Sequence, residues 1–119
     1  LEMNKDDMKY RTRQFALRVI RLVESLPKGR TENVLGKQLL RSCTSVGANY
    51  RAACRAKSTA DFIYKMGIVE EETDESLYWM ELLIEATIIE SKKLEPLMKE
   101  ANELLAITVA SIKTAKKNK

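Results

Sequence analysis

The sequence predicts an all-α fold, an antiparallel up-down-up-down four-helix bundle, from three observations. Apolar residues recur at helical spacing in four successive segments. The 119 residues contain only four Gly and two Pro, too few for the many tight turns of an all-β fold. The connections between the segments are short, which favours antiparallel neighbours. We therefore expect a single domain over residues 1–119, long enough to bury its own core.

The first two helices are predicted on either side of a helix-breaking segment. Residues 1–9 are expected to be flexible, and Leu1 and Glu2, which precede Met3, are interpreted as a cloning remnant. A first helix is predicted over about 10–26 and ends at the breaker 27–29. Thr31 is the predicted N-cap of a second helix over about 32–56. The apolar faces of these two helices are formed by Phe15, Val19, Leu22, Val23 and Leu26, and by Leu35, Leu39, Cys43, Val46, Tyr50 and Cys54.

The third and fourth helices are predicted from capping signals. Ser58 is the expected N-cap of a helix over about 59–90, with Asp61 three residues later in the capping-box position. The pair Lys92-Lys93 suits the negative C-terminal end of that helix. Pro96 is expected in the first turn of a fourth helix, which continues to about residue 113. Residues 114–119 are predicted to be a frayed basic tail.

The third helix has apolar residues on two sides. One stripe faces the expected core, and a second lies about 160° away, at 100° per residue. A helix that is apolar on two sides is usually buried on both, so the second stripe indicates either a subunit interface or a broad core face. Glu75 lies within the second stripe and needs a partner if buried, for which Arg51, Arg55 or an arginine of a neighbouring subunit are candidates. The oligomer-interface candidates are Tyr64, Ile68, Glu75, Trp79 and Leu82.

The charges are unevenly distributed along the chain, although the net charge is only +4. Residues 1–57 have a net charge of +8, residues 58–112 of −8, and residues 113–119 of +4. Basic stripes follow the first and second helices, with Arg13 apart from them, and an acidic stripe follows the third. Three interpretations stay open: phosphate binding, pairing of charges during assembly, and a solvated surface. The candidates for phosphate contact are Arg11, Arg18, Arg21, Lys37, Arg41, Arg51 and Arg55.

Several classes of site are excluded by composition and motif. The chain has no histidine, so it has no histidine general base and no His-ligated zinc. Glu71 and Glu75 lie at i, i+4 without a histidine to complete a di-metal site, and no Gly-rich phosphate loop is present. We expect no catalytic residue, cofactor or metal, and no enzymatic activity.

The two cysteines bear on the cellular compartment. Cys43 and Cys54 are eleven residues apart on one predicted helix, about 16 Å at 1.5 Å per residue, which is too far for a disulfide. Free thiols are typical of a reducing cytoplasm. No apolar stretch approaches the roughly 18 residues of a membrane span, and the first nine residues lack the apolar region of a signal peptide. The expected location is cytoplasmic, without a membrane partner.

The most specific part of the sequence lies between residues 44 and 83. The runs TSVGANYRAACRAKS (44–58), DF (61–62), GIVEEE (67–72) and DESLYWMELL (74–83) closely resemble the bacterial "four helix bundle protein" family, also called 23S rRNA intervening-sequence-encoded proteins. The resemblance implies a closed four-helix bundle that assembles as a ring-shaped homopentamer. It also implies kinship to the accessory variability protein of diversity-generating retroelements, a basic pentameric barrel that binds nucleic acid and a reverse transcriptase. It implies no known enzymatic activity.

The residue patterns and the family resemblance together predict a small, non-enzymatic, oligomeric adaptor that associates with nucleic acid, in particular RNA. The alternative is a protein-binding scaffold whose charged faces serve self-assembly or docking of a partner protein. In the first case the basic stripes contact phosphates, and in the second they belong to an assembly surface.

Overall fold

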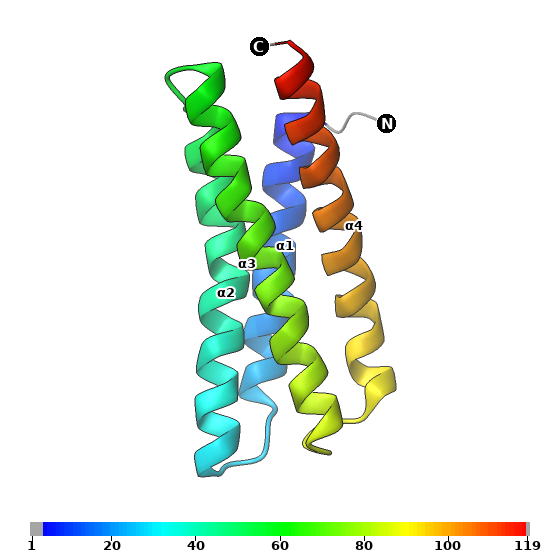
Figure 1. Cartoon of the computed structure of the whole chain (residues 1–119). Helices are drawn as coiled ribbons and strands as arrows, with labels where there is room; N and C mark the ends of the chain where they lie inside the picture. Colours follow the sequence, from blue (N-terminus) through cyan, green and yellow to red (C-terminus); the bar gives the residue numbers. More distant parts are fainter. Residues whose placement is uncertain (1–3, 119) are drawn as a thin grey trace.

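The computed structural model describes residues 4–118, which form four long helices. These are α1 (Lys5–Glu24), α2 (Arg30–Cys54), α3 (Thr59–Glu85) and α4 (Ser91–Lys117), and the described residues contain no strand. Successive helices run in opposite directions in a bundle of 47 × 23 × 21 Å (Figure 1). The predicted all-α architecture of four helices is confirmed. Leu1 and Glu2, interpreted as a cloning remnant, lie outside the described residues, as does Lys119.

The core forms where the apolar faces of all four helices meet. Helices α2 and α3 pack against each other most extensively, and α1 and α4 least. At the α2–α3 contact the buried Ser76 hydroxyl donates to the Ser42 hydroxyl at 2.9 Å, so small polar side chains let these helices approach closely. The fully buried large side chains come from every helix: Met8, Phe15 and Val19, then Leu39 and Val46, then Met66, Val69, Met80 and Leu83, then Leu94 and Leu104.

Both cysteines are free thiols, as the spacing predicted. Cys43 is buried in the core, and this burial raises the pKa of its thiol to about 12. Cys54 is half-buried in the last turn of α2. None of the four described helices includes an apolar stretch long enough to cross a membrane.

Helix α1 begins earlier than predicted, so the expectation of a flexible segment over residues 1–9 is wrong from Asn4 onward. Asn4 is the N-cap, and its side chain accepts a hydrogen bond of 2.8 Å from the Asp7 backbone N–H. Asp6 and Asp7 lie in the first turn, where carboxylates complement the helix dipole. Met8 is fully buried and anchors this turn to the core.

Helix α2 begins before Thr31, so the prediction of Thr31 as N-cap is wrong. Gly29 occupies the N-cap position without a side-chain cap, and its carbonyl accepts from the Asn33 N–H at 3.0 Å. The helix ends at Cys54 rather than 56, and the Arg55 and Ala56 N–H groups bond to carbonyls three residues back. This tight last turn leads directly into the α2–α3 loop.

Helix α3 begins as predicted and ends five residues early. The Ser58 hydroxyl accepts from the Asp61 N–H at 3.0 Å, which confirms Ser58 as the N-cap. At the other end Thr87 has a positive φ of 57°. The Thr87 N–H bonds to the Ile84 carbonyl and the Ile88 N–H to the Leu83 carbonyl, the pattern of a Schellman motif. The left-handed residue ends the helix before the predicted residue 90.

Helix α4 is longer at both ends than predicted. It begins at Ser91, so Pro96 lies inside the helix rather than in its first turn. Lys92 and Lys93 fall in the first turn of α4, not at the end of α3 as predicted, because the preceding helix stops at Glu85. Burial of Leu94 and Leu97 holds this end in place. The predicted frayed tail is wrong for residues 114–117, which continue the helix.

Candidate nucleic-acid interface

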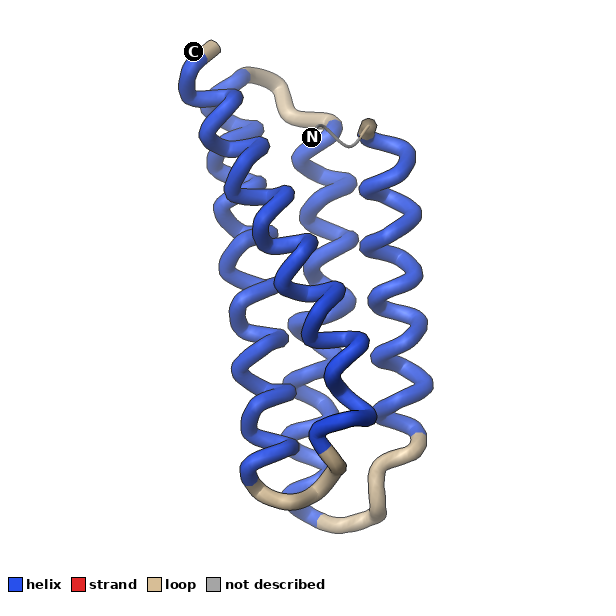
Figure 2. Tube along the Cα trace, turned by 90° about the vertical axis from the view of Figure 1, so that its right-hand side faces the viewer, coloured by secondary structure: helices blue, strands red, loops and turns tan. Residues whose placement is uncertain are grey.

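One end of the bundle collects most of the positive charge. The start of α1, the α2–α3 loop and the end of α4 lie together there (Figures 1 and 2). We call it the basic end, and define it as residues 5–13, 51–65 and 113–117. Its cations are Lys5, Lys9, Arg11, Arg13, Arg51, Arg55, Lys57, Lys65, Lys113, Lys116 and Lys117, against the carboxylates of Asp6, Asp7 and Asp61. The net charge of these residues is +8, and it is +6 when Glu100 and Glu103, the partners of Arg11, are counted with them, so a positive potential faces solvent at this end.

Two adjoining grooves begin at the basic end and extend along α2 toward the middle of the bundle. The larger has a volume of about 550 Å³ and is lined by Lys9, Ala48, Arg51, Ala52, Arg55 and Lys65, which come from α1, α2 and α3. The smaller, of about 220 Å³, runs between α1 and α2 and is lined by Lys9, Thr12, Arg13, Ala16, Thr44, Gly47, Ala48 and Arg51. We call the two together the basic groove. Neither part has an acidic residue in its lining.

Small residues form the floor of the basic groove. A Cβ placed on Gly47 would lie 3.2 Å from the Thr12 hydroxyl oxygen, so α1 and α2 approach closely at this point. Thr12 is itself buried, and its hydroxyl donates to the Lys9 carbonyl at 3.1 Å. Because Ala48 and Ala52 add only methyl groups on the outer face of α2, the floor stays open between the cations.

The cations of the basic groove differ in their partners. Lys65 pairs with Asp61 at 3.1 Å one helical turn away. The Lys57 backbone N–H and the Lys65 ammonium group hold the pKa of the Asp61 carboxyl below its usual value. Within residues 4–118, the other four groove cations, Lys9, Arg13, Arg51 and Arg55, form no ion pair. They are therefore available to an anionic ligand without breaking an intramolecular pair.

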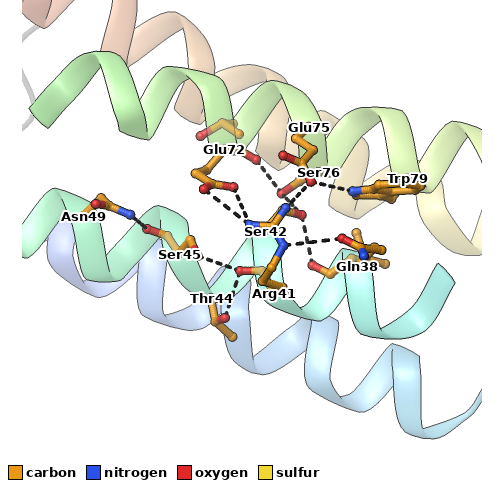
Figure 3. A network of polar contacts seen from close by, with 12 residues as sticks. Gln38, Arg41, Ser42, Thr44, Ser45, Asn49, Glu72, Glu75, Ser76 and Trp79 are labelled. Atoms are coloured by element: carbon orange, nitrogen blue, oxygen red, sulfur yellow. Dashed lines mark hydrogen bonds and ion pairs between the residues drawn. The ribbon is translucent and has the colours of Figure 1, made fainter. Parts of the chain in front are cut away.

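Arg41, a predicted phosphate contact, belongs instead to a network between α2 and α3 (Figure 3). Its guanidinium donates to both carboxylate oxygens of Glu72, at 3.2 and 3.4 Å, and forms a close ion pair with Glu75. Trp79 Nε1 donates to the same Glu75 carboxylate at 2.9 Å. The hydrogen bond from Trp79 and the pairing with Arg41 lower the pKa of Glu75. Within the chain the partner of Glu75 is thus Arg41, and not Arg51 or Arg55, two of the three candidates that the sequence gave.

Arg11, a second predicted phosphate contact, joins α1 to α4. Its Nε and Nη2 atoms donate to the two carboxylate oxygens of Glu100 at 3.0 and 2.6 Å, and Nη2 also donates to Glu103 at 2.9 Å. The hydrogen bond to Glu100 is the main cause of a raised Arg11 pKa. The two carboxylates already neutralise this guanidinium, so Arg11 contributes little attraction for a phosphate.

The remaining predicted phosphate contacts divide into two groups. Arg51 and Arg55 line the basic groove. Arg18 and Arg21 lie in the second half of α1, and Lys37 lies in the first half of α2, all away from the basic end. Lys37 lines a separate groove that also includes the carboxylates of Glu24 and Glu32. The structure therefore does not bring the seven predicted residues together into one surface.

The predicted interface residues of α3 differ in exposure. Tyr64 is the most exposed of them, at 69 %. Ile68, Trp79 and Leu82 are half-buried, and Trp79 packs against the core. Tyr78, which the sequence did not single out, is 52 % exposed and its ring meets the Trp79 ring edge-on with centroids 5.1 Å apart.

Lys9, Arg13 and Lys65 are the groove residues that the sequence did not indicate. Arg13 is set apart from the other arginines of α1 by its position on the helix, and that separation turns it toward α2. What places these residues in the groove is the way α1 packs against α2. Thr12 packs on Gly47, and this contact places Lys9 and Arg13 beside residues 44–51 of α2. This register is not visible in either helix alone.

The comparisons with known proteins agree with this fold. The fold is similar to the crystal structure of a protein of unknown function from the S23 ribosomal protein family of Bacteroides thetaiotaomicron. The two sequences are 38% identical, and the TM-score is 0.86. The match covers 93% of this chain and 99% of that one. No curated protein matches the chain significantly. The family model for the 23S rRNA-intervening sequence protein matches residues 5–110. The chain therefore belongs to the 23S rRNA-intervening sequence protein family.

Proposed function

We propose that this protein is a non-enzymatic adaptor that associates with RNA through its basic end. The observation that carries the proposal is the gathering of ten Lys and Arg residues, besides the Arg11 that Glu100 and Glu103 neutralise, against three Asp residues at one end of the bundle. Nucleic-acid affinity depends largely on cations that displace the counterions of the phosphate backbone. The family name, which refers to an intervening sequence in 23S rRNA, favours RNA as the nucleic acid.

The arrangement of Arg51 and Arg55 supports phosphate contact. Arg51 lies in the last turn of α2 and Arg55 is the C-cap of that helix, and both side chains line the same groove. Guanidinium groups match phosphate oxygens in two parallel hydrogen bonds. The three lysines in the last turns of α4 are held at the negative end of a helix dipole and add to the potential nearby.

The test is a fluorescence-anisotropy titration with a labelled RNA hairpin and a DNA duplex of the same stem length, at 50 and 200 mM salt. We expect micromolar or tighter binding at 50 mM salt and a steep loss at 200 mM. The variant Arg51→Glu/Arg55→Glu should weaken binding at least tenfold. Lys92→Glu/Lys93→Glu is the matched control, because it changes the charge equally at the opposite end. If the unmodified protein does not bind either probe at 50 mM salt, the proposal is wrong.

Self-association is the second candidate role. Tyr64 and Tyr78 expose aromatic surface on α3, and aromatic side chains are typical anchors of protein interfaces. We propose a homo-oligomer that uses this side of α3, with five subunits as the resemblance implies. Light scattering at micromolar concentration should give a mass well above 13.6 kDa, and Tyr64→Glu should lower it. A monomeric mass for the unmodified protein would contradict this role. If Arg51→Glu/Arg55→Glu dissociates the oligomer, the basic stripe belongs to the assembly surface.

A further inference from the structure

We propose that the basic groove is the RNA site itself, and that it holds the sugar–phosphate backbone of one strand without reading bases. The proposal rests on the proposed function and specifies its site. It assigns Lys9 and Arg13 of α1 as phosphate contacts together with Arg51 of α2 and its C-cap Arg55. The cations elsewhere on the first two helices supply only long-range attraction.

The length of the groove matches a short stretch of backbone. Its α2 lining runs from Thr44 to Arg55, about 16 Å at 1.5 Å per residue. The groove is therefore long enough for a few consecutive phosphates of one strand. The groove supplies five cations from three helices, of which Lys65 is already paired with Asp61. Four contacts are therefore available without a change in the fold.

The floor of the groove favours close approach of a backbone. Gly47, Ala48 and Ala52 leave room between the cations, so a phosphate can come close to the charged side chains that flank the floor. The lining includes no aromatic residue on which a base could stack, and no Asn or Gln to pair with a base edge. Binding should therefore depend on charge and shape rather than on sequence.

The salt dependence gives a quantitative expectation. Four phosphate contacts predict a slope of log affinity against log salt of about −3.6 for a duplex and about −2.8 for a single strand. Between 50 and 200 mM salt this corresponds to a loss of about 150-fold or 50-fold. A slope near zero would show that the contacts are not ionic.

The first experiment reverses the charges of Lys9 and Arg13, the two groove residues of α1. Lys9→Glu/Arg13→Glu is titrated with the labelled RNA hairpin and compared with Arg21→Glu/Lys37→Glu. The second pair has the same change in charge, and both of its residues are exposed and outside the groove. The groove variant should lose at least tenfold in affinity, with a slope less steep by about 1.8. The control should lose less than about threefold.

The second experiment fills the groove without changing any charge. Ala48→Leu places a larger apolar side chain on the exposed floor, and Ala106→Leu is the control on the exposed face of α4. We expect at least fivefold weaker binding for Ala48→Leu and no change for Ala106→Leu. Far-UV circular dichroism and thermal unfolding establish that each variant keeps the helical fold.

The outcomes separate this proposal from the proposed function. Equal losses of RNA affinity for the two charge-reversal pairs, or unchanged binding by Ala48→Leu, would show that the basic groove is not the RNA site. RNA binding by a diffuse basic surface would then remain. More than tenfold preference between two hairpins with unrelated stems would overturn backbone-only recognition. No binding by the unmodified protein would overturn the proposed function, and the groove with it.

Discussion

Arg11 of α1 holds Glu100 of α4 in a two-pronged ion pair, with donor–acceptor distances of 3.0 and 2.6 Å. The side chains are only 23% and 17% exposed, and the pair crosses the helix contact with the least extensive packing in the bundle. A charge-assisted pair of this geometry is among the stronger polar contacts in proteins. The ion pair links α1 to α4, the two neighbouring helices that pack together least extensively.

Arg11→Met should lower the free energy of unfolding by about 1.5–3 kcal/mol, because it leaves the Glu100 carboxylate partly buried without its main partner. Urea unfolding measures the difference. Arg18→Met is the matched control, since Arg18 is a half-buried arginine of the same helix and forms no ion pair within residues 4–118. The double variant Arg11→Met/Glu100→Met should recover part of the loss. Equal stability of Arg11→Met and the unmodified protein would show that the pair does not hold α1 to α4.

Thr87→Gly should stabilise the fold by about 0.5–1 kcal/mol. Thr87 has a φ of 57°, a left-handed conformation that costs a residue with a Cβ about 1–2 kcal/mol. Glycine adopts it freely, although its greater freedom in the unfolded chain offsets part of the gain. Thermal unfolding measures the change. Thr114→Gly, a helical threonine in α4, should instead lower stability by about 0.3 kcal/mol. Lower stability of Thr87→Gly would mean that the Thr87 side chain makes a stabilising contact that outweighs the backbone strain.

Gly67→Ala should raise the free energy of unfolding by about 0.5–1 kcal/mol. Gly67 lies inside α3, where glycine is a poor helix former, and a Cβ there would meet nothing within 4 Å. Gly47→Ala is the comparison, because its Cβ would lie 3.2 Å from Thr12 and crowding offsets the gain. Chemical denaturation measures the free energy of unfolding of both variants. If Gly67→Ala is destabilising, a surface from outside the chain covers this position, as a second copy bound along α3 would.

Glu75 should make stability depend on acid pH. The hydrogen bond from Trp79 and the pairing with Arg41 lower its pKa below the ordinary value of 4.5. A carboxyl with a lowered pKa in the fold contributes stability that is full above the unfolded value and lost as the pH falls through the folded value. The stability difference between the protein and Glu75→Gln should therefore be present at pH 7, at no more than about 1 kcal/mol for this partly exposed group.

The pH dependence is measured by thermal unfolding of both proteins between pH 7 and 2. The difference should shrink below pH 4.5 and vanish at the acid end. Asp61, whose pKa is also lowered, titrates in both proteins, so its contribution cancels in the comparison. A difference that stays constant down to pH 2 would show that the Glu75 charge does not stabilise the fold. Glu72 shares Arg41, and Glu72→Gln serves as the second comparison.

The number of helices and their apolar faces followed from the sequence because helical periodicity is a local property. Phe15 and Val19, Leu39 and Cys43, and Met66 and Val69 recur one turn apart, and each pair is buried in the core. Ser58 could be recognised as an N-cap because its partner lies three residues away. The start of α1 is not predicted although Asn4 and Asp7 have the same spacing, because residues 4–7 include no apolar residue that would extend the helical pattern ahead of Met8.

The sequence by itself determined the all-α class, the core faces and the concentration of positive charge in the first half of the chain. Only the tertiary structure decided which charges meet. It paired Arg41 with Glu72 and Glu75, and Arg11 with Glu100, and it brought Lys9 and Arg13 beside Arg51. Each of these outcomes depends on how far one helix is shifted and rotated against its neighbour. Core packing, such as Thr12 against Gly47, sets that register over distances that no local pattern spans.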